Sequence, residues 1–396
     1  MLSLKDPISI LSKQYFEDTV ALRRHFHQYP ELSEQESNTA LYVANCLKQY
    51  DIESQMYLEN KAVIALIKGK NTCEKTIALR ADMDALPIEE KNDFDFHSLN
   101  RGVMHACGHD VHIASLLTTA RILHELKKEW AGNIKLIFQP SEEKLPGGAI
   151  RLIKAGVLEN PKVDVVLGLH VDPAIETGKI GMKEGEYMAS TDEIYITVTG
   201  KGGHAAIVDM VINPLLIAAK ILLELEECYV KSAPKNRPSV LAFGRIIGEG
   251  KTNIIPDEVY LEGTLRTFDE RWRNKAHQLI TDVANRTAKE MKGKADVHII
   301  TGYPVLSNDE VLTKKAIKTA QEFLGKENVL SLDYRMTAED FAYYACSVPS
   351  VFYRLGTQIK GYDAGLHSPF FRVNEEALRM SPAFMAYLAI TLLGSI

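Results

Sequence analysis

The sequence lacks three features that would assign it at once to a class of protein: a long apolar run, a cysteine framework and a strong charge imbalance. No stretch of its 396 residues reaches the roughly 18–20 uninterrupted apolar residues that a membrane-spanning helix needs. The start, Met1–Pro7, has no basic segment followed by an apolar run, so no signal peptide is visible. The five cysteines are an odd number without a Cys-x-x-Cys pair, which is unlike a disulfide framework. We therefore expect a cytoplasmic protein without a membrane partner.

Neither sign of charge is in large excess. Lys and Arg total 46 and Asp and Glu total 52, so the formal net charge is −6. A balance this mild gives no general attraction to nucleic acid or to anionic lipid, and neither is an expected partner. With 46% hydrophobic and 25% charged residues, the composition is that of a globular protein long enough for two or three domains.

The first half of the chain alternates helical apolar spacing with short apolar runs. Helices are predicted at Asp6–Gln28, Ser37–Tyr50, His109–Glu129 and near Gly148–Ala155, and buried strands at Ala62–Lys68, Thr76–Arg80, Ile134–Phe138 and Val163–Gly168. Buried strands separated by helices predict an α/β fold with a mainly parallel sheet and helices on both faces. The same pattern returns after Tyr303, with a strand at Val351–Leu355.

A different pattern lies between these two parts. Thr191–Thr199 alternates apolar and polar residues, as a half-exposed antiparallel strand does. It is followed by a predicted helix, two strands, a helix and a strand, at Pro214–Val230, Val240–Ile247, Glu258–Thr267, Arg271–Met291 and Ala295–Thr301. The order β-α-β-β-α-β is the ferredoxin-like arrangement. The sequence therefore predicts one domain of residues 1–185 and 303–396, interrupted by an inserted ferredoxin-like α+β domain of residues 186–302.

Metal-ligating side chains follow several of the predicted strands or precede the long helix. Ligands of open α/β sheets bind beyond the carboxyl ends of the strands, so these residues meet at one edge of the sheet. Each one taken alone is more often structural, and the inference rests on their convergence. The mixture of thiolate, imidazole and carboxylate suits Zn²⁺ or a similar divalent ion. We expect a di-metal centre held by Cys107, His109, Glu143, His170 and His367.

Glu142 stands directly before the predicted ligand Glu143. Two adjacent carboxylates at a strand end usually mark a solvated turn, but beside a metal they can divide the work. Glu143 would coordinate, which leaves Glu142 to take a proton from a metal-activated water and to pass it to a leaving amine.

The inserted domain has three further candidates. His204 lies in the glycine-rich segment Gly200–Ala206, which is either an ordinary hairpin loop or a loop that exposes the imidazole. Asn253 precedes Ile254-Ile255-Pro256. Arg266 lies on a predicted strand, where an arginine more often makes a surface ion pair, although its guanidinium is well suited to hold a carboxylate at two points.

Nine segments in a fixed order resemble the aminoacylase/carboxypeptidase metallopeptidase family over essentially the whole chain. The resemblance is to its amidohydrolase branch, which contains N-acyl-amino-acid amidohydrolases, hippurate hydrolases, indoleacetyl-amino-acid hydrolases and N-acetyldiaminopimelate deacetylase. The segments are Leu79–Pro87, Met104–His109, Gln139–Glu143, Gly168–His170, Gly200–Ala206, Asn253–Asp257, Gly263–Thr267, Ala338–Phe341 and Leu366–His367.

This resemblance implies an amidohydrolase that cleaves the amide bond of N-acyl amino acids with two divalent ions per subunit, Zn²⁺ or Mn²⁺, with Co²⁺ or Ni²⁺ as further candidates. It assigns the five residues named above to the ions and Glu142 to the general base. It assigns His204 to the tetrahedral intermediate, often across a subunit boundary, and Asn253 and Arg266 to the substrate. The inserted domain is then the lid and dimerisation domain of a homodimer, and Asp84 is expected to orient a ligand.

Three alternatives stay open at this point. The same di-metal scaffold could serve an aminopeptidase or dipeptidase, or a binding protein without catalysis. Cys107 as a cysteine-protease nucleophile is the weakest of the three, because predicted metal ligands surround it. Ile207-Val208 stand where the branch commonly has Pro-His, which bears on the choice of acyl group and amino acid rather than on the reaction.

Overall fold

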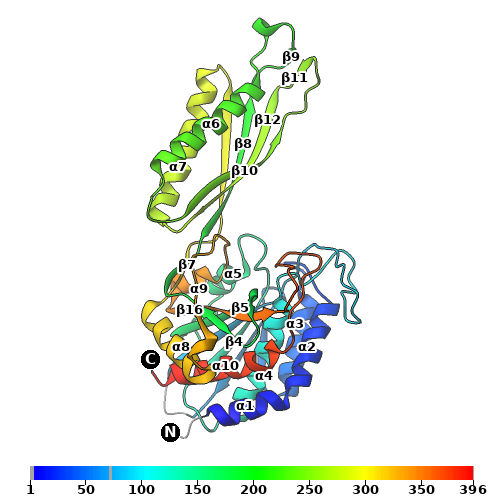
Figure 1. Ribbon diagram of the computed structural model, residues 1–396, viewed down its shortest axis with the longest axis vertical. Helices are drawn as coiled ribbons and strands as arrows, with labels where there is room; N and C mark the ends of the chain where they lie inside the picture. Colours follow the sequence, from blue (N-terminus) through cyan, green and yellow to red (C-terminus); the bar gives the residue numbers. More distant parts are fainter. Residues whose placement is uncertain (1–3, 71–73, 396) are drawn as a thin grey trace. The chain divides into compact units, whose positions relative to one another are not determined.

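The computed structural model describes residues 4–70 and 74–395, which form two compact units (Figure 1). The first unit comprises Met1–Tyr187, Ser307–Asp333 and Asp340–Ile396, and the second Met188–Leu306 and Tyr334–Glu339. Cys73 and the first three residues of the sequence lie outside the described residues. The four described cysteines, Cys46, Cys107, Cys228 and Cys346, form no disulfide. No described helix has both the length and the hydrophobicity that crossing a bilayer requires.

An eight-stranded sheet forms the centre of the first unit. Its four middle strands run parallel, because β3 pairs in parallel with β4 and β5, and β5 with β16; β1, β2 and β6 join antiparallel. Every residue of β3 is buried, as expected of a strand covered on both faces. In spatial order the strands are β1 (Ser54–Tyr57), β2 (Ala62–Lys68), β4 (Asn133–Gln139), β3 (Thr76–Asp82), β5 (Val165–Glu176), β16 (Ser350–Gln358), β6 (Ile180–Met182) and β15 (Val329–Ser331). The mainly parallel sheet is confirmed.

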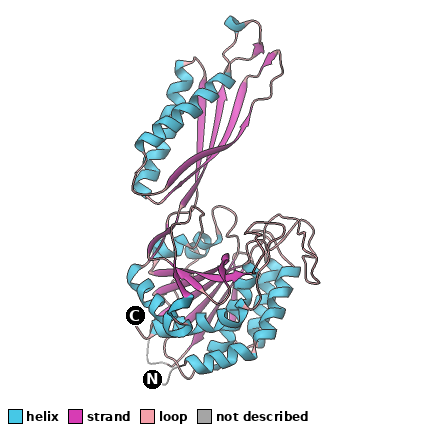
Figure 2. Cartoon of the chain, viewed as in Figure 1, coloured by secondary structure: helices cyan, strands magenta, loops and turns pink. Residues whose placement is uncertain are grey.

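Helices cover both faces of this sheet (Figure 2). On one face, α4 (His109–Glu125) packs against β3 and against α10 (Ala377–Leu393), with α1 (Lys5–Gln14), α2 (Phe16–Gln28), α3 (Ser37–Gln49) and α8 (Glu310–Leu324) around them. On the other, α5 (Gly148–Lys154) packs against β4 and α9 (Ala342–Ser347). Residues 109–120 of α4 are buried on every side, so this helix is part of the core rather than a surface helix.

The second unit is a four-stranded antiparallel sheet with two helices. Its first strand, β8 (Ser190–Thr199), pairs with its third, β12 (Glu258–Thr267), and its fourth, β13 (Lys294–Thr301); its second, β10 (Ser239–Ile247), is at the edge. This is the predicted ferredoxin-like arrangement. Ile194, Ile196 and Val198 of β8 pack against α6 (Pro214–Ser232) and α7 (Glu270–Glu290) in a separate core. Two pieces extend from this sheet: the short pair β9 (Gly203–His204) and β11 (Ile254–Ile255), and the 3-10 turn η1 (Val208–Met210).

A second short strand pair lies where the chain passes between the units. It consists of β7 (Gly185–Met188) and β14 (Leu306–Asn308), which pair in a two-stranded sheet.

Candidate metal centre

The start of α4, the loop after β4, the middle of β5 and the loop after β16 carry the predicted ligands; these are Cys107 and His109, Glu143, His170 and His367, respectively. Cys107 and His109 flank Gly108 at the start of α4. Gly108 has a φ of +82°, and a Cβ there would lie 2.5 Å from the side chain of Val171 in β5. Only glycine therefore allows the start of α4 to come this close to β5, the strand that carries His170.

The five side chains converge in two overlapping groups. In one group the ligand atoms of Cys107, His109 and His170 all lie within 4.8 Å of one another, and in the other those of Cys107, Glu143 and His367 do. Cys107 Sγ lies 3.3 Å from His170 Nε2, and His367 Nε2 lies 3.2 Å from Glu143 Oε1. Cys107 belongs to both groups, which is the position of a ligand shared by two ions.

The hydrogen bonds of two histidines fix which nitrogen faces the centre. His109 Nδ1 donates to the backbone carbonyl of Asp84 at 2.8 Å, and His170 Nδ1 donates to that of Val171 at 2.7 Å. A carbonyl only accepts, so each Nδ1 carries a proton and each Nε2 faces the other ligands. The buried His109 Nε2 has no hydrogen-bond partner among the described residues, and Glu143 Oε1 has no contact there besides the ion pair with His367. A divalent cation would satisfy both atoms, so the donor set fits such an ion.

Carboxylates dominate the electrostatics of the centre. Burial opposes the charged form of His109, but the carboxylates of Asp82, Asp84 and Glu143 outweigh it and raise the pKa of His109 to about 10. A pKa above neutrality means that the pocket by itself draws in positive charge. A bound cation would supply that charge in place of the proton.

The thiol of Cys107 is in a different state from that of a cysteine-protease nucleophile. Burial and the nearby carboxylates raise the pKa of Cys107 well above its usual value, while burial lowers the pKa of the neighbouring His170. Both shifts oppose the thiolate–imidazolium pair that the protease mechanism needs. The pair does not support the cysteine-protease alternative.

Glu142 and Asp84 stand beside the ligand groups. The carboxylate of Glu142 lies within 4.8 Å of the ligand atoms of His109 and Glu143, and only 6% of the residue is exposed. Asp84 Oδ2 accepts the backbone N–H of Glu143 at 2.9 Å, and its Oδ1 lies 3.4 Å from His109 Nδ1. Asp84 therefore touches two predicted ligands without belonging to either group, a position from which it can orient both.

A buried pair of side chains beside the predicted ligands, Asp82 and His112, was not predicted from the sequence. His112 Nδ1 donates to Asp82 Oδ1 at 2.5 Å, and His112 Nε2 accepts the N–H of Val171 at 3.0 Å. Asp82 Oδ2 lies 3.7 Å from His109 Nε2 and is paired with Arg80 at 2.5 Å. A signal existed for both: Asp82 stands in the segment Leu79–Pro87, and His112 follows His109 by three residues, one helical turn.

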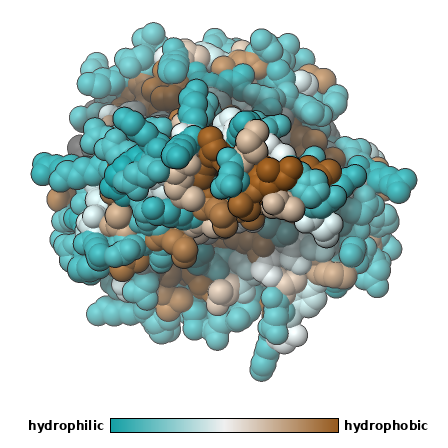
Figure 3. Space-filling model, turned by 90° about the horizontal axis from the view of Figure 1, so that it is seen from above, coloured by the Kyte–Doolittle hydropathy of each residue, from teal (hydrophilic) through white to brown (hydrophobic). Residues whose placement is uncertain are grey.

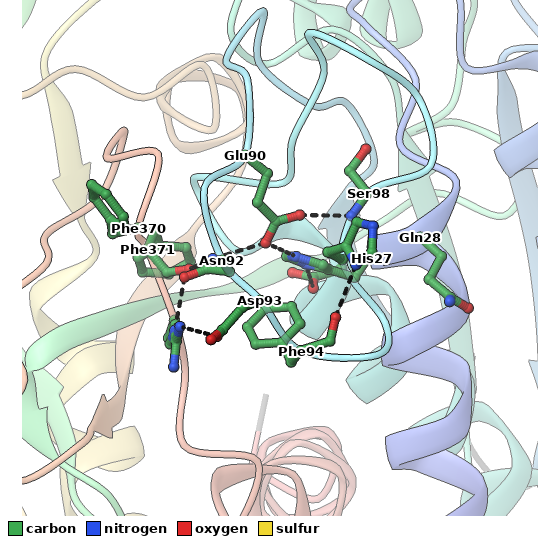
Figure 4. Close-up of polar contacts among 12 residues, drawn as sticks. His27, Gln28, Glu90, Asn92, Asp93, Phe94, Ser98, Phe370 and Phe371 are labelled. Atoms are coloured by element: carbon green, nitrogen blue, oxygen red, sulfur yellow. Dashed lines mark hydrogen bonds and ion pairs between the residues drawn. The ribbon is translucent and has the colours of Figure 1, made fainter.

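A second buried network connects the start of α4 with α2 and with the loop around residues 90–98. Figure 4 shows the part of it that His27, Glu90 and Ser98 form. Asp110, next to His109, forms ion pairs at 2.8 Å with Arg23 Nε and with His27 Nδ1, both in α2. His27 Nε2 donates to Glu90 Oε1 at 3.0 Å, and the other oxygen of Glu90 accepts the N–H of Ser98 at 2.6 Å. Burial and Arg23 oppose the charged imidazole, but the bonds to Asp110 and Glu90 raise the pKa of His27. The network ties α2 and the loop around residues 90–98 to the start of α4.

The remaining predicted site residues lie in the second unit. His204 of β9 is exposed and pairs with Ile254 of β11, and the N–H of Ala205 donates to the carbonyl of Asn253 at 3.0 Å. His204 Nδ1 accepts the N–H of Ala206 at 3.2 Å, so its proton is on Nε2. The structure thus brings His204 and Asn253 together, while Arg266 lies near the end of β12, an inner strand of the unit's sheet.

Matches to known proteins extend along nearly the whole chain. The profile of peptidase family M20/M25/M40 matches residues 78–391. The N-acetyl-L-cysteine deacetylase of Bacillus subtilis strain 168 is 37% identical over 388 residues, which cover 98% of this chain and 90% of the relative. The N-acyl-L-amino acid amidohydrolase of Geobacillus stearothermophilus is 38% identical over 77% of this chain and 82% of its own. The crystal structure of a dinuclear metal binding peptidase from family M20 of B. subtilis matches with a TM-score of 0.82 at 33% identity, covering 97% of this chain and 100% of that one.

Proposed function

The chain belongs to peptidase family M20/M25/M40, as a metallo-hydrolase of amide bonds, and from this premise we propose that it removes the acyl group from N-acyl amino acids. One observation carries the proposal: the buried Glu142 lies beside two groups of ligand atoms that share Cys107. Relatives at 37% and 38% identity bear the names of an N-acetyl-L-cysteine deacetylase and an N-acyl-L-amino acid amidohydrolase.

Two divalent ions fit the side chains of the centre. Cys107, His109 and His170 would hold one ion, and Cys107, Glu143 and His367 the other. When bound, such ions polarise a carbonyl and lower the pKa of water to about 7. Zn²⁺ or Mn²⁺ is our first choice, with Co²⁺ and Ni²⁺ as alternatives, since the donors combine sulfur, nitrogen and oxygen.

Glu142 acts as the general base and acid of the reaction. Its carboxylate takes one proton from the attacking water, whose oxygen forms the new bond to the amide carbon. When the C–N bond breaks, Glu142 gives that proton to the leaving nitrogen, so the products are a carboxylic acid and a free amine. Asp84 accepts the backbone N–H of the adjacent Glu143 and so fixes the backbone of this proposed ligand.

His204, Asn253 and Arg266 are assigned to the substrate through the family. His204 donates its Nε2–H to the oxygen of the scissile carbonyl, which agrees with the proton position that Ala206 imposes. Arg266 holds the substrate's carboxylate, and Asn253 contacts the substrate. An arginine at this place favours N-acyl amino acids over the aminopeptidase alternative, because a free α-amino group needs an acidic anchor instead.

The exposed apolar surface of the second unit supports a homodimer. Leu216, Leu223 and Val230 recur at every seventh residue along α6 and are 61%, 73% and 51% exposed. They form one stripe on the helix, and β10 beside it is an edge strand. Further apolar side chains of this unit are exposed at Ile207, Val208, Met210 and Ile254. The face of the molecule drawn in Figure 3 has a cluster of hydrophobic residues, coloured brown, near its centre. A stripe and an open sheet edge side by side favour pairing with a second copy.

A substrate panel tests the proposal. Metal-free protein is reconstituted separately with Zn²⁺, Mn²⁺, Co²⁺ and Ni²⁺ and offered acetyl, benzoyl and indoleacetyl amino acids, with dipeptides as the contrast. We expect release of the free amino acid from at least one N-acyl series and slower cleavage of dipeptides. Preference for dipeptides with a free amino group would favour the aminopeptidase alternative instead.

A further inference from the structure

We propose that Glu36 is a positioning residue that holds the turn carrying Glu142 and Glu143 in its working shape. The inference rests on the proposed roles of these two glutamates, and Glu36 itself stands more than 100 residues earlier in the chain. Nothing in the sequence marks it, because Glu36 is one of three glutamates between positions 31 and 36.

Glu36 is completely buried and accepts hydrogen bonds from Ser141, the residue before Glu142. Its Oε1 accepts the backbone N–H of Ser141 at 2.7 Å and the Ser141 hydroxyl at 3.1 Å. The backbone N–H of Glu34 donates to the same hydroxyl at 2.9 Å. Burying a carboxylate costs free energy unless it accepts hydrogen bonds. The two hydrogen bonds from Ser141 therefore stabilise the buried carboxylate of Glu36.

Ser141 needs this support because of its backbone conformation. Its φ of +56° lies in the left-handed region, which a serine rarely adopts. The chain reverses there between the end of β4 and the start of α5. The Ser141 carbonyl accepts the N–H of Gly148 at 3.0 Å, and a Cβ on Gly148 would lie 1.8 Å from the carbonyl oxygen of Pro140. The turn is therefore close-packed as well as strained.

The same loop also reaches the other end of the turn. Ser33 Oγ donates to Asp84 Oδ2 at 2.7 Å, and that oxygen accepts the N–H of Glu143. Residues 33–36 thus hold Ser141 directly and Glu143 through Asp84, with Glu142 between them. Two fixed points on either side of Glu142 leave its backbone little freedom, which is the condition for a base to stay in reach of its proton.

The test compares Glu36→Ala with Glu36→Gln, which keeps an acceptor oxygen. For Glu36→Ala we expect kcat to fall about 10- to 100-fold with KM nearly unchanged. In titrations of Zn²⁺ alone into metal-free protein, we expect the affinity of one of two binding steps to fall by about the same factor as kcat, because the loosened turn carries Glu143. Glu36→Gln should restore both quantities to within about threefold of wild type.

A matched control lies two residues away. Glu34 makes an exposed ion pair with Lys144 at 2.5 Å, so Glu34→Ala removes a carboxylate from the same loop and a contact to the same turn. Exposed pairs contribute little, and we expect kcat and Zn²⁺ binding to stay at wild-type values. If Glu36→Ala does not fold, Ser141→Ala serves instead: it removes the two hydrogen bonds of the Ser141 hydroxyl, to Glu36 and from Glu34, and should lower kcat about fivefold.

Two results would overturn the proposal. One is a folded Glu36→Ala protein whose kcat and Zn²⁺ affinities match those of wild type. The other is a Glu34→Ala protein as impaired as Glu36→Ala. Failure of the proposed function looks different: wild type would then release no amino acid from any N-acyl substrate, while the Zn²⁺ titrations of the variants would still decide the role of Glu36.

Discussion

The ring nitrogen that carries the proton decides what each histidine of the proposed site can do. The carbonyls of Asp84 and Val171 keep the Nδ1 protons of His109 and His170, and the N–H of Ala206 keeps the proton of His204 on Nε2. The first two arrangements suit the proposed ligands, and the third suits the proposed donor. In each case a neighbouring backbone group sets which nitrogen carries the proton.

Replacing the proposed base tests its role directly. In Glu142→Gln, the amide cannot accept a proton, so we expect kcat to fall about 10²- to 10⁴-fold. The ligand groups do not depend on Glu142, and elemental analysis should still find the wild-type metal content. Retained turnover in a fully loaded protein would assign the base elsewhere.

His204→Ala removes the proposed donor to the carbonyl oxygen. Loss of one such donor typically lowers kcat about 10²- to 10³-fold. His204 is exposed in its own unit, so we expect the melting temperature to stay unchanged. Steady-state kinetics together with a thermal melt would check both parts, and near-normal kcat would contradict the assignment.

Elements show where sequence patterns suffice and where they fail. Buried strands such as β2 and β4 are found to within a residue, since short apolar runs between polar turns have few alternatives. His170 was expected after its strand, but β5 continues to Glu176 because β16 pairs with it beyond that point. The predicted helix Asp6–Gln28 is two helices, broken at Tyr15, so that α1 packs mainly on α10 and α2 on α4.

The proposed ligands were easier to predict from the sequence than the residues that hold them in place. The proposed ligands stand in segments that follow predicted strands or begin the long helix, whereas Glu36, His27 and Asp110 act through partners that lie far away in the sequence. Their roles depend on burial and on which elements meet, and neither is written in local spacing. The turn at Ser141 likewise gives no sign of its left-handed backbone, because serine is not a residue that usually marks one.

The His27 network makes a prediction about the elements it joins. The pKa of His27 is raised in the folded protein, so its charge stabilises the fold below the unfolded-state pKa, and this contribution is lost as the pH rises through the folded-state pKa. We expect the free energy of unfolding to decrease over that range. His27→Gln should be less stable and should lack this part of the pH dependence, which urea unfolding at several pH values would measure.

For the whole molecule, the ions should couple activity to stability. Chelation removes the proposed cation beside His109 Nε2 and Glu143 Oε1, so we expect loss of activity and a lower melting temperature. At an ion concentration 100 times the Kd, binding stabilises the folded state by about 2.7 kcal/mol. Adding back Zn²⁺ or Mn²⁺ should restore both quantities; unchanged activity after complete chelation would contradict the metal centre.

The proposed dimer depends on the apolar stripe of α6. Leu223 is its most exposed member, and Leu223→Glu places a charge in the middle of the stripe. We expect the molar mass in sedimentation to fall from that of two chains to that of one. Ile10→Glu, on α1 of the first unit, is the control for an exposed apolar side chain and should leave the mass unchanged.

The pairing of β7 with β14 has a consequence for how such a protein can be assembled from parts. Because these strands are neighbours, the points where the chain departs for the ferredoxin-like unit and returns from it are side by side. A linker of a few residues could bridge them, and the parallel sheet would lose none of its own strands. An insertion joined at two adjacent points can be exchanged as a unit, so that substrate contacts can change while the proposed metal ligands of the first unit stay in place.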